Sequence, residues 1–197
     1  RMPYKVAMDT YGSDKPDTRF GMELHDVKEL LINSTFSGFQ TAEAIRAIKV
    51  EGVGTTTTRK VIDSLNLEAK KFGLGGLTVL KVENDALAGS FIKFLDENQQ
   101  SGILTELEAK NNDIILIAAG PYDRVMSLLG SLRCKYAKEL NLIKRNTYDL
   151  LWVVDFPLFE RDVESGAITS THHPFTRPRD EDLHYLDTDP TKILTYA

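Results

Sequence analysis

Two segments of the chain carry apolar residues at helical spacing. In the first, apolar side chains recur every three or four residues from Val61 to Phe72, and Thr57 or Thr58 stands where a capping residue would. The second stripe is stronger and runs from Tyr122 to Leu140, opened by Pro121, a residue typical of helix starts. The spacing therefore predicts two amphipathic helices.

Three short apolar runs, at 44–50, 76–83 and 113–120, predict strands, because they are too short for helices and are flanked by polar residues or glycines. Shorter helices are predicted over Asp26–Ile32, from Ser90, and from Ser101 as a cap. This order of elements predicts an α+β fold. We expect a two-layer domain in which two helices cover one face of a small, mostly antiparallel sheet.

The segments on either side of this domain differ from it in the structure that their sequences predict. Residues 1–26 are polar and are predicted to be irregular, whereas 147–160 predicts a long strand whose Pro157 favours an edge or a bulge. A turn at 164–166 and a strand at 167–171 would complete an antiparallel strand pair. Asp189 and Pro190 predict a helix that carries the end of the chain.

The pattern predicts three parts: residues 1–26, a domain over 27–145, and residues 146–197 with the strand pair. An isolated two-stranded ribbon is marginal in water, so we expect this pair to belong to a larger sheet. The chain does not begin with methionine, and its last residues are predicted to lie within a helix. We therefore expect a segment cut from a longer protein.

Composition narrows the classes of function. The 29 acidic residues outnumber the 24 basic ones, whereas a free-standing nucleic-acid-binding protein usually carries a basic excess. The single cysteine, Cys134, excludes an internal disulfide and suits a reducing compartment. No apolar run is long enough to cross a membrane, and the N-terminus carries no signal pattern.

His172 and His173 are the first candidates for chemistry. Neighbouring side chains on a strand point to opposite faces, so one imidazole could reach a pocket while the other supports it from behind. The alternative is a hydrogen-bonded pair at a strand end. Two histidines without further ligands do not predict a metal site.

The run YGSDKPD is the second candidate. Asp14, Lys15, Asp17 and, just beyond the run, Arg19 place mixed charge on a tight loop that could lie beside a phosphate or a tRNA, or could satisfy itself as a turn. The basic pairs at 59–60, 70–71 and 144–145 predict solvated faces or contacts with an RNA backbone. No phosphate-binding loop, dinucleotide fingerprint or nucleophile motif occurs.

A resemblance adds what spacing cannot. The run RMPYKVAMDTYGSDKPDTRFGMEL resembles the segment after the second class II signature motif of bacterial-type aspartyl-tRNA synthetases. LWVVDFPLFE, HHPFT and PRDEDL resemble the stretch before their third motif, and the middle block is similar to the inserted GAD domain of that family. The same domain occurs in a Glu-tRNA amidotransferase subunit. The resemblance covers essentially the whole chain, although four threonines at 55–58 and the run Leu65-Asn66-Leu67 depart from the family pattern.

The resemblance implies a cytoplasmic, homodimeric parent enzyme that joins L-aspartate to tRNA-Asp with ATP and Mg²⁺. His172 would lie at the aspartate pocket with His173 as its support, and Asp14, Lys15 and Asp17 would lie at the rim. The parent's ATP-binding arginines are absent, so we expect no catalytic residue in this chain and a non-catalytic inserted domain near the tRNA acceptor arm. The alternatives are a stand-alone tRNA-binding or protein-interaction module, like that of the amidotransferase subunit, and a structural spacer.

Overall fold

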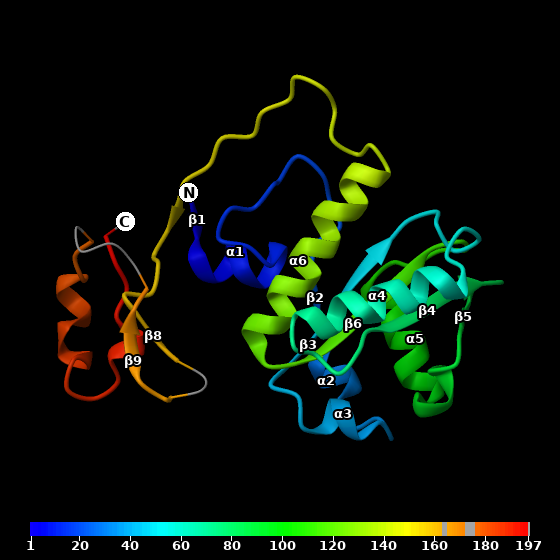
Figure 1. Ribbon diagram of the computed structural model, residues 1–197, viewed down its shortest axis with the longest axis horizontal. Helices are drawn as coiled ribbons and strands as arrows, with labels where there is room; N and C mark the ends of the chain where they lie inside the picture. Colours follow the sequence, from blue (N-terminus) through cyan, green and yellow to red (C-terminus); the bar gives the residue numbers. More distant parts are fainter. Residues whose placement is uncertain (163–164, 172–175, 197) are drawn as a thin grey trace. The chain divides into compact units, whose positions relative to one another are not determined.

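The computed structural model describes residues 1–162, 165–171 and 176–196. The chain divides into two compact units, one formed by residues 9–148 and the other by residues 1–8 together with 149–197 (Figure 1). The boundaries predicted for the inserted domain, after residue 26 and after residue 145, remain a prediction. No helix in the described part of the chain is both long and apolar enough to cross a membrane.

The unit of residues 9–148 is built on an antiparallel sheet. Within the described residues its strands follow the order β2-β3-β6-β4-β5, and every neighbouring pair is antiparallel. The strands are β2 (His25–Asp26), β3 (Ala44–Val50), β4 (Thr78–Glu83), β5 (Ala86–Ala88) and β6 (Ile114–Gly120). The α+β class, the antiparallel sheet and the separate strand pair are therefore confirmed.

Both faces of the central strands are mainly apolar. On β3, Ile45 and Ile48 point to opposite faces of the sheet, and both are fully buried. Helix α6 packs on β3 and β6 from one side, while short helices on the other side complete a core around Ile45 and Ile117. The expected layer of two helices is thus joined by a second set of helices, because a sheet without a polar face must be covered twice.

The two long helices are α4 (Arg59–Lys71) and α6 (Tyr122–Glu139). They lie side by side, joined by an ion pair of 2.8 Å between Glu68 Oε2 and Lys135 Nζ (Figure 1). The opposite face carries α2 (Lys28–Leu31), α3 (Ser37–Gln40), the 3-10 helix η1 (Ile92–Phe94) and α5 (Glu97–Glu106).

The predicted cap at Ser101 is wrong, whereas the cap of α4 is at Thr58, one of the two residues predicted for it. Asp96 caps α5 by accepting a hydrogen bond from the Gln99 backbone, and the Gln99 side chain accepts one in return, so Ser101 lies inside the helix. Thr58 stands at the cap position of α4 but makes no side-chain cap hydrogen bond. The hydroxyl of Thr57 instead donates to the carbonyl of Val53, because the chain before α4 is itself a closed turn.

The expectation of irregular structure over 1–26 is wrong. Helix α1 covers Tyr4–Tyr11, after the short strand β1 (Met2–Pro3). The signal was present, since Tyr4, Ala7, Met8 and Tyr11 follow helical spacing and Ala7 is fully buried. Strand β5 was also missed. It follows a two-residue hairpin turn in which Asn84 and Asp85 both have positive φ, the geometry that two-residue hairpins favour.

The other unit contains short, separate elements. Strand β1 pairs with β7 (Val153–Val154) in parallel, and β8 (Phe159–Arg161) pairs with β9 (Ile168–Ser170) as an antiparallel hairpin. The long strand predicted over 147–160 is therefore broken, because Asp155 has a φ of +62° and interrupts the extended backbone. The 3-10 helices are η2 (Asp180–Tyr185) and η3 (Pro190–Lys192).

The predicted C-terminal helix is shorter than expected. It begins at Pro190 as predicted but ends at Lys192. Leu194 and Thr195 are then extended and form isolated bridges with Pro157 and Pro178. These bridges engage the backbone that a continued helix would have needed for its own hydrogen bonds.

Candidate functional site

The loop after α1, which contains Asp14, Lys15 and Asp17, is held against α6 by a contact between two glycines. A Cβ atom on Gly130 would lie 2.4 Å from the carbonyl oxygen of Gly12, and one on Gly12 would lie 2.3 Å from that of Met126. Gly12 also has a φ of +66°, which side chains rarely adopt. Only glycine at both positions allows the loop to approach the helix so closely.

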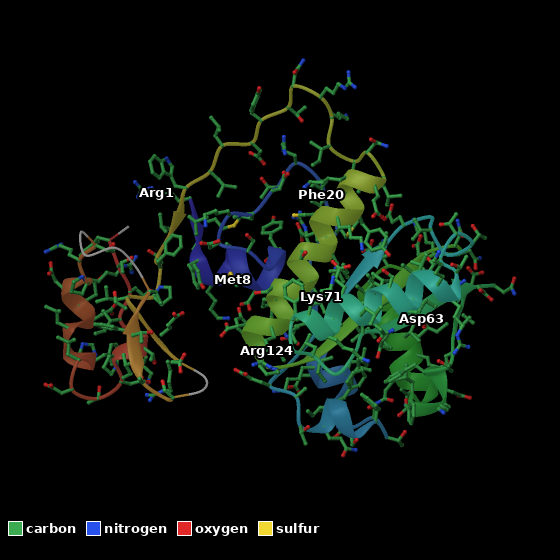
Figure 2. The ribbon with its side chains drawn as sticks, in the orientation of Figure 1. Arg1, Met8, Phe20, Asp63, Lys71 and Arg124 are labelled. Atoms are coloured by element: carbon green, nitrogen blue, oxygen red, sulfur yellow. The ribbon has the colours of Figure 1, made fainter. Side chains whose placement is uncertain are left out.

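Arg133, one helical turn further along α6, is the second anchor of the loop. Its guanidinium is buried, lies 4.0 Å from the centre of the Phe20 ring and donates hydrogen bonds to the carbonyls of Phe20 (2.9 Å) and Gly21 (3.0 Å). The ring of Tyr11 lies 4.8 Å away. Burial lowers the pKa of Arg133, because the surroundings disfavour its charge. Figure 2 shows Phe20 beside this end of α6.

The charged residues of the loop mostly satisfy one another. Arg19 donates to both carboxylate oxygens of Asp17, at 2.9 and 2.7 Å, and also to the carbonyl of Thr147 at 3.2 Å. The hydrogen bond from Arg19 holds the pKa of Asp17 below its ordinary value. Lys15 pairs with Asp14 at 3.2 Å, and its side chain is 86% exposed.

This geometry separates the candidate residues of the loop into two kinds. Asp17 and Arg19 brace the loop, so they have little capacity left for a ligand. Lys15 and Asp14 stand in solvent, where an ion pair contributes little and is readily exchanged for another partner. Of the predicted rim residues, Lys15 is therefore best suited to contact an anionic group.

A second charged cluster lies in the other unit and was not predicted as a site. Arg179 pairs with Asp155 and lies 4.0 Å from the carboxylate of Glu181. Tyr196 donates a hydrogen bond of 3.0 Å to Glu181, and the guanidinium of Arg177 lies 4.8 Å from its ring. The pKa of Glu181 is lowered, chiefly by its own backbone N–H and then by Tyr196. The sequence signal was a pair of arginines, Arg177 and Arg179, followed directly by three acidic residues at 180–182.

His172 and His173 lie outside the described residues, so their predicted role remains a prediction. The basic pairs at 59–60, 70–71 and 144–145 are exposed. Arg124, labelled near Lys71 in Figure 2, donates to the carbonyl of Gly73 at 3.1 Å, just beyond the C-terminal end of α4. In the described part of the chain no three His, Cys, Asp or Glu side chains are grouped so that they could hold a metal ion.

Comparison with known proteins places the chain among its relatives. Residues 37–129 match the model of the GAD domain family. The whole chain is 45% identical to the aspartate–tRNA(Asp/Asn) ligase of Geobacillus sp. (strain WCH70) and 42% identical to the aspartate–tRNA ligase of Listeria monocytogenes serotype 4a (strain HCC23). It is 44% identical to the aspartate–tRNA(Asp/Asn) ligase of Lachnoclostridium phytofermentans.

In each of these comparisons the match includes 100% of this chain and 34% of the relative. The chain thus spans about a third of the length of the curated relatives that it matches. The resemblance read from the two flanking segments and the middle block is confirmed. Over its whole length the chain is similar to bacterial aspartate–tRNA ligases, and its residues 37–129 match the GAD domain family.

Proposed function

We propose that this chain contributes to aspartate–tRNA ligation, in which L-aspartate is activated with ATP and passed to tRNA-Asp in the cytoplasm. The observation that carries the proposal is sequence identity of 41–45% to aspartate–tRNA ligases along all 197 residues. Because the chain spans 34% of the length of those ligases, we propose that it supplies some of the residues that the reaction needs and does not catalyse the whole reaction by itself.

The proposal gives the unit of residues 9–148 a non-catalytic role beside the acceptor arm of the tRNA. The internal pairing of Asp17 with Arg19 and the burial of Arg133 support this, because groups that brace a loop are not available to reacting atoms. ATP and Mg²⁺ are the cofactors that the proposal requires. The described residues offer no cluster suited to a metal ion, so no step through Mg²⁺ is assigned to them.

In this proposal, His172 and His173 are the residues that contact the substrate directly. His172 would hold L-aspartate and His173 would support it, in a homodimeric ligase. A neutral or protonated imidazole can bind a carboxylate and keep it oriented for attack on ATP. The relatives' names include both Asp and Asp/Asn ligases, so the proposal does not extend to tRNA-Asn.

The first test is ATP–pyrophosphate exchange by the chain itself. With L-aspartate and ATP we expect exchange at background, because one histidine pair cannot replace the groups that stabilise charge on a transferring phosphoryl centre. The complete Geobacillus enzyme serves as the active reference. Exchange well above background by these 197 residues would contradict the assignment of a partial role.

The second test places the chain in a complete ligase. These 197 residues replace the corresponding third of the Geobacillus enzyme, and we expect the hybrid to aspartylate tRNA-Asp. His172→Ala should raise the KM for aspartate by about tenfold, the loss of one hydrogen bond to a charged group, and change the KM for ATP far less. His184→Ala is the matched control, since His184 lies on η2 and its ring contacts neighbours on that same helix, the Glu181 carbonyl at 2.7 Å and the ring of Tyr185.

A hybrid that shows a cooperative thermal transition yet forms no aspartyl-adenylate would refute the proposed function. The rival hypothesis, a stand-alone tRNA-binding module, is tested by gel shift of tRNA-Asp with the chain at low and moderate salt. Binding that weakens steeply with salt would favour the module, because it reports neutralised phosphates. We expect no stable complex, consistent with the excess of acidic residues.

A further inference from the structure

The unit of residues 9–148 carries a groove of about 590 Å³ that the proposed ligase function does not use. It lies between the segment 20–25, the end of β3, the end of α5 and the turn after α6. All of its lining residues belong to this one unit. A groove of this size is within the range that holds several side chains of a ligand.

The groove has an apolar floor. Phe20 and Leu107 are buried beneath it, and Leu140 and Leu142 line it from the turn after α6. Leu142 is 42% exposed, although its backbone is fixed by a hydrogen bond of 2.9 Å to the carbonyl of Ala137. An exposed leucine on a fixed backbone beside two buried apolar residues offers a contact surface for an apolar side chain.

The rim of the groove is acidic. Glu23, Glu51, Glu106 and Glu108 line it, against a single lysine, Lys49. Lys49 is already engaged, since its ammonium lies 3.1 Å from Glu51 and donates to the Glu108 carbonyl at 3.2 Å. His25 lies 3.1 Å from Glu106. The side chains of Glu51 and Glu106 remain 76% and 51% exposed, so negative charge is in excess where a ligand would enter.

The shape of the groove is set before any ligand binds. Met22 and Glu108 are both held at positive φ, and the carbonyl of Gly21 accepts a hydrogen bond from buried Arg133. The backbone before β2 is tied to α1 by a bond of 2.8 Å from the Leu24 N–H to the Thr10 carbonyl. A ligand would therefore bind to an already ordered surface, so that binding would not include the entropic cost of ordering it.

We propose that this groove binds a basic peptide segment of another protein, with a leucine-like side chain on the floor and lysine or arginine at the rim. Charge complementarity selects the occupant. A phosphate backbone would be repelled by the four glutamates, and an acidic peptide would be repelled as well. The unit of residues 9–148 would thereby carry a protein-binding face that is separate from any contact with tRNA.

The experiment measures fluorescence anisotropy of a labelled peptide, GRLKLRKG, titrated with the 197-residue chain. We expect Kd in about the micromolar to hundred-micromolar range, weakened by salt, as for a small charged interface. The acidic peptide GELELEEG should not bind. Amide chemical shifts on addition of GRLKLRKG should change at 20–25, 106–108 and 140–142, the residues of the groove.

The charge-reversing variant Glu51→Lys/Glu106→Lys should weaken binding by about tenfold or more, because two rim carboxylates become cations. Glu106 ends α5, where a lysine suits the helix dipole, so the fold should persist. The matched control is Asp63→Lys/Glu83→Lys, which makes the same change in net charge at exposed positions outside the groove. It should change the affinity by less than about twofold.

Leu142→Ser tests the floor separately and should weaken binding by about threefold or more, through lost apolar area. Equal loss in the groove variant and its control would show nonspecific attraction and overturn the proposal. Unchanged affinity in the groove variant would do so as well. The proposal also fails if the chain self-associates and the substitution Leu67→Asp abolishes the self-association. Leu67 lies on α4 and is 61% exposed, so that result would identify α4 of a second copy as the occupant of the groove.

Discussion

At the residue scale, the contact between Gly12 and Gly130 and the buried guanidinium of Arg133 fix the loop after α1. None of these three residues was singled out from the sequence. Glycine and arginine are common on helices and in loops, and their role depends on what faces them. The sequence allowed two interpretations of Asp17, as a ligand and as part of a self-satisfied turn, and the contact with Arg19 matches the second.

Gly130→Ala should destabilise the unit of residues 9–148 by about 2 kcal/mol or more, because the added Cβ would overlap backbone atoms of the loop, which cannot rotate away. Urea unfolding followed by circular dichroism measures the change. Gly75→Ala is the matched control, since a Cβ there meets nothing within 4 Å. Its stability should lie within about 0.5 kcal/mol of the parent chain. Equal effects of both substitutions would argue against the close contact.

The ion pair between Asp17 and Arg19 makes the stability of the loop depend on pH. The hydrogen bond from Arg19 lowers the folded-state pKa of Asp17 below 3.8, so its stabilisation is fully present above that value. It is lost as the pH falls through the lowered pKa. Because both side chains are partly exposed, the effect should stay below about 1 kcal/mol. Urea unfolding between pH 6 and pH 3 should show a smaller acid-induced loss for Asp17→Asn than for the parent chain.

At the element scale, periodicity located the central strands β3 and β6 and the long helices α4 and α6, but it did not locate the ends of elements as well. Ser101 was predicted as a cap because serine often caps helices, but Asp96 with Gln99 three residues later forms the capping box. The apolar pattern of α5 is weak, so it did not show which of two suitable residues precedes the first turn.

Asp96→Ala should lower the free energy of unfolding by about 1 kcal/mol, because the backbone N–H of Gln99 loses its acceptor. Ser101→Ala is an informative control. If Ser101 were the cap, its substitution would cost a similar amount. Because it lies inside α5, we expect a change within about 0.5 kcal/mol or a slight gain from the better helix former. Thermal unfolding of the two variants distinguishes the two positions of the cap.

The strand predicted over 147–160 failed for a different reason. Its aromatic and β-branched residues favour extended structure, and the segment is extended in part. A strand also needs a neighbouring strand along its length, however, and none of the described strands includes residues 148–152. Tyr148, Leu150 and Trp152 are consequently more than 70% exposed. Propensity favoured a strand here, but pairing decided which residues form one.

At the scale of the whole molecule, the unit formed by residues 1–8 and 149–197 combines segments from both sides of the other unit, since β1 at residues 2–3 pairs with β7 at 153–154. In the sequence, the unit of residues 9–148 lies between these two segments as an insertion. Residues 143–152 connect the units without helix or strand and are mostly exposed. Such a segment is where proteases cut first, because cleavage requires an extended and accessible backbone.

Brief trypsin digestion should therefore cut first after Lys144 or Arg145, leaving a product whose mass ends at one of these residues. The basic pair at 70–71 provides an internal comparison, because it is equally exposed but ends the helix α4. Mass spectrometry of early time points identifies the sites. First cleavage after Lys70 or Lys71 would contradict the view that the connecting segment is the most accessible backbone.

The sequence by itself determined the α+β class, the central strands, the long helices and the relationship to aspartate–tRNA ligases, because these depend on local periodicity and on runs of neighbouring residues. Only the tertiary structure decided that Arg133 is buried, that both faces of the sheet are covered and that an acidic groove opens between segments distant in the chain. Burial and charge clustering are properties of surfaces brought together by folding. No spacing within one segment specifies them.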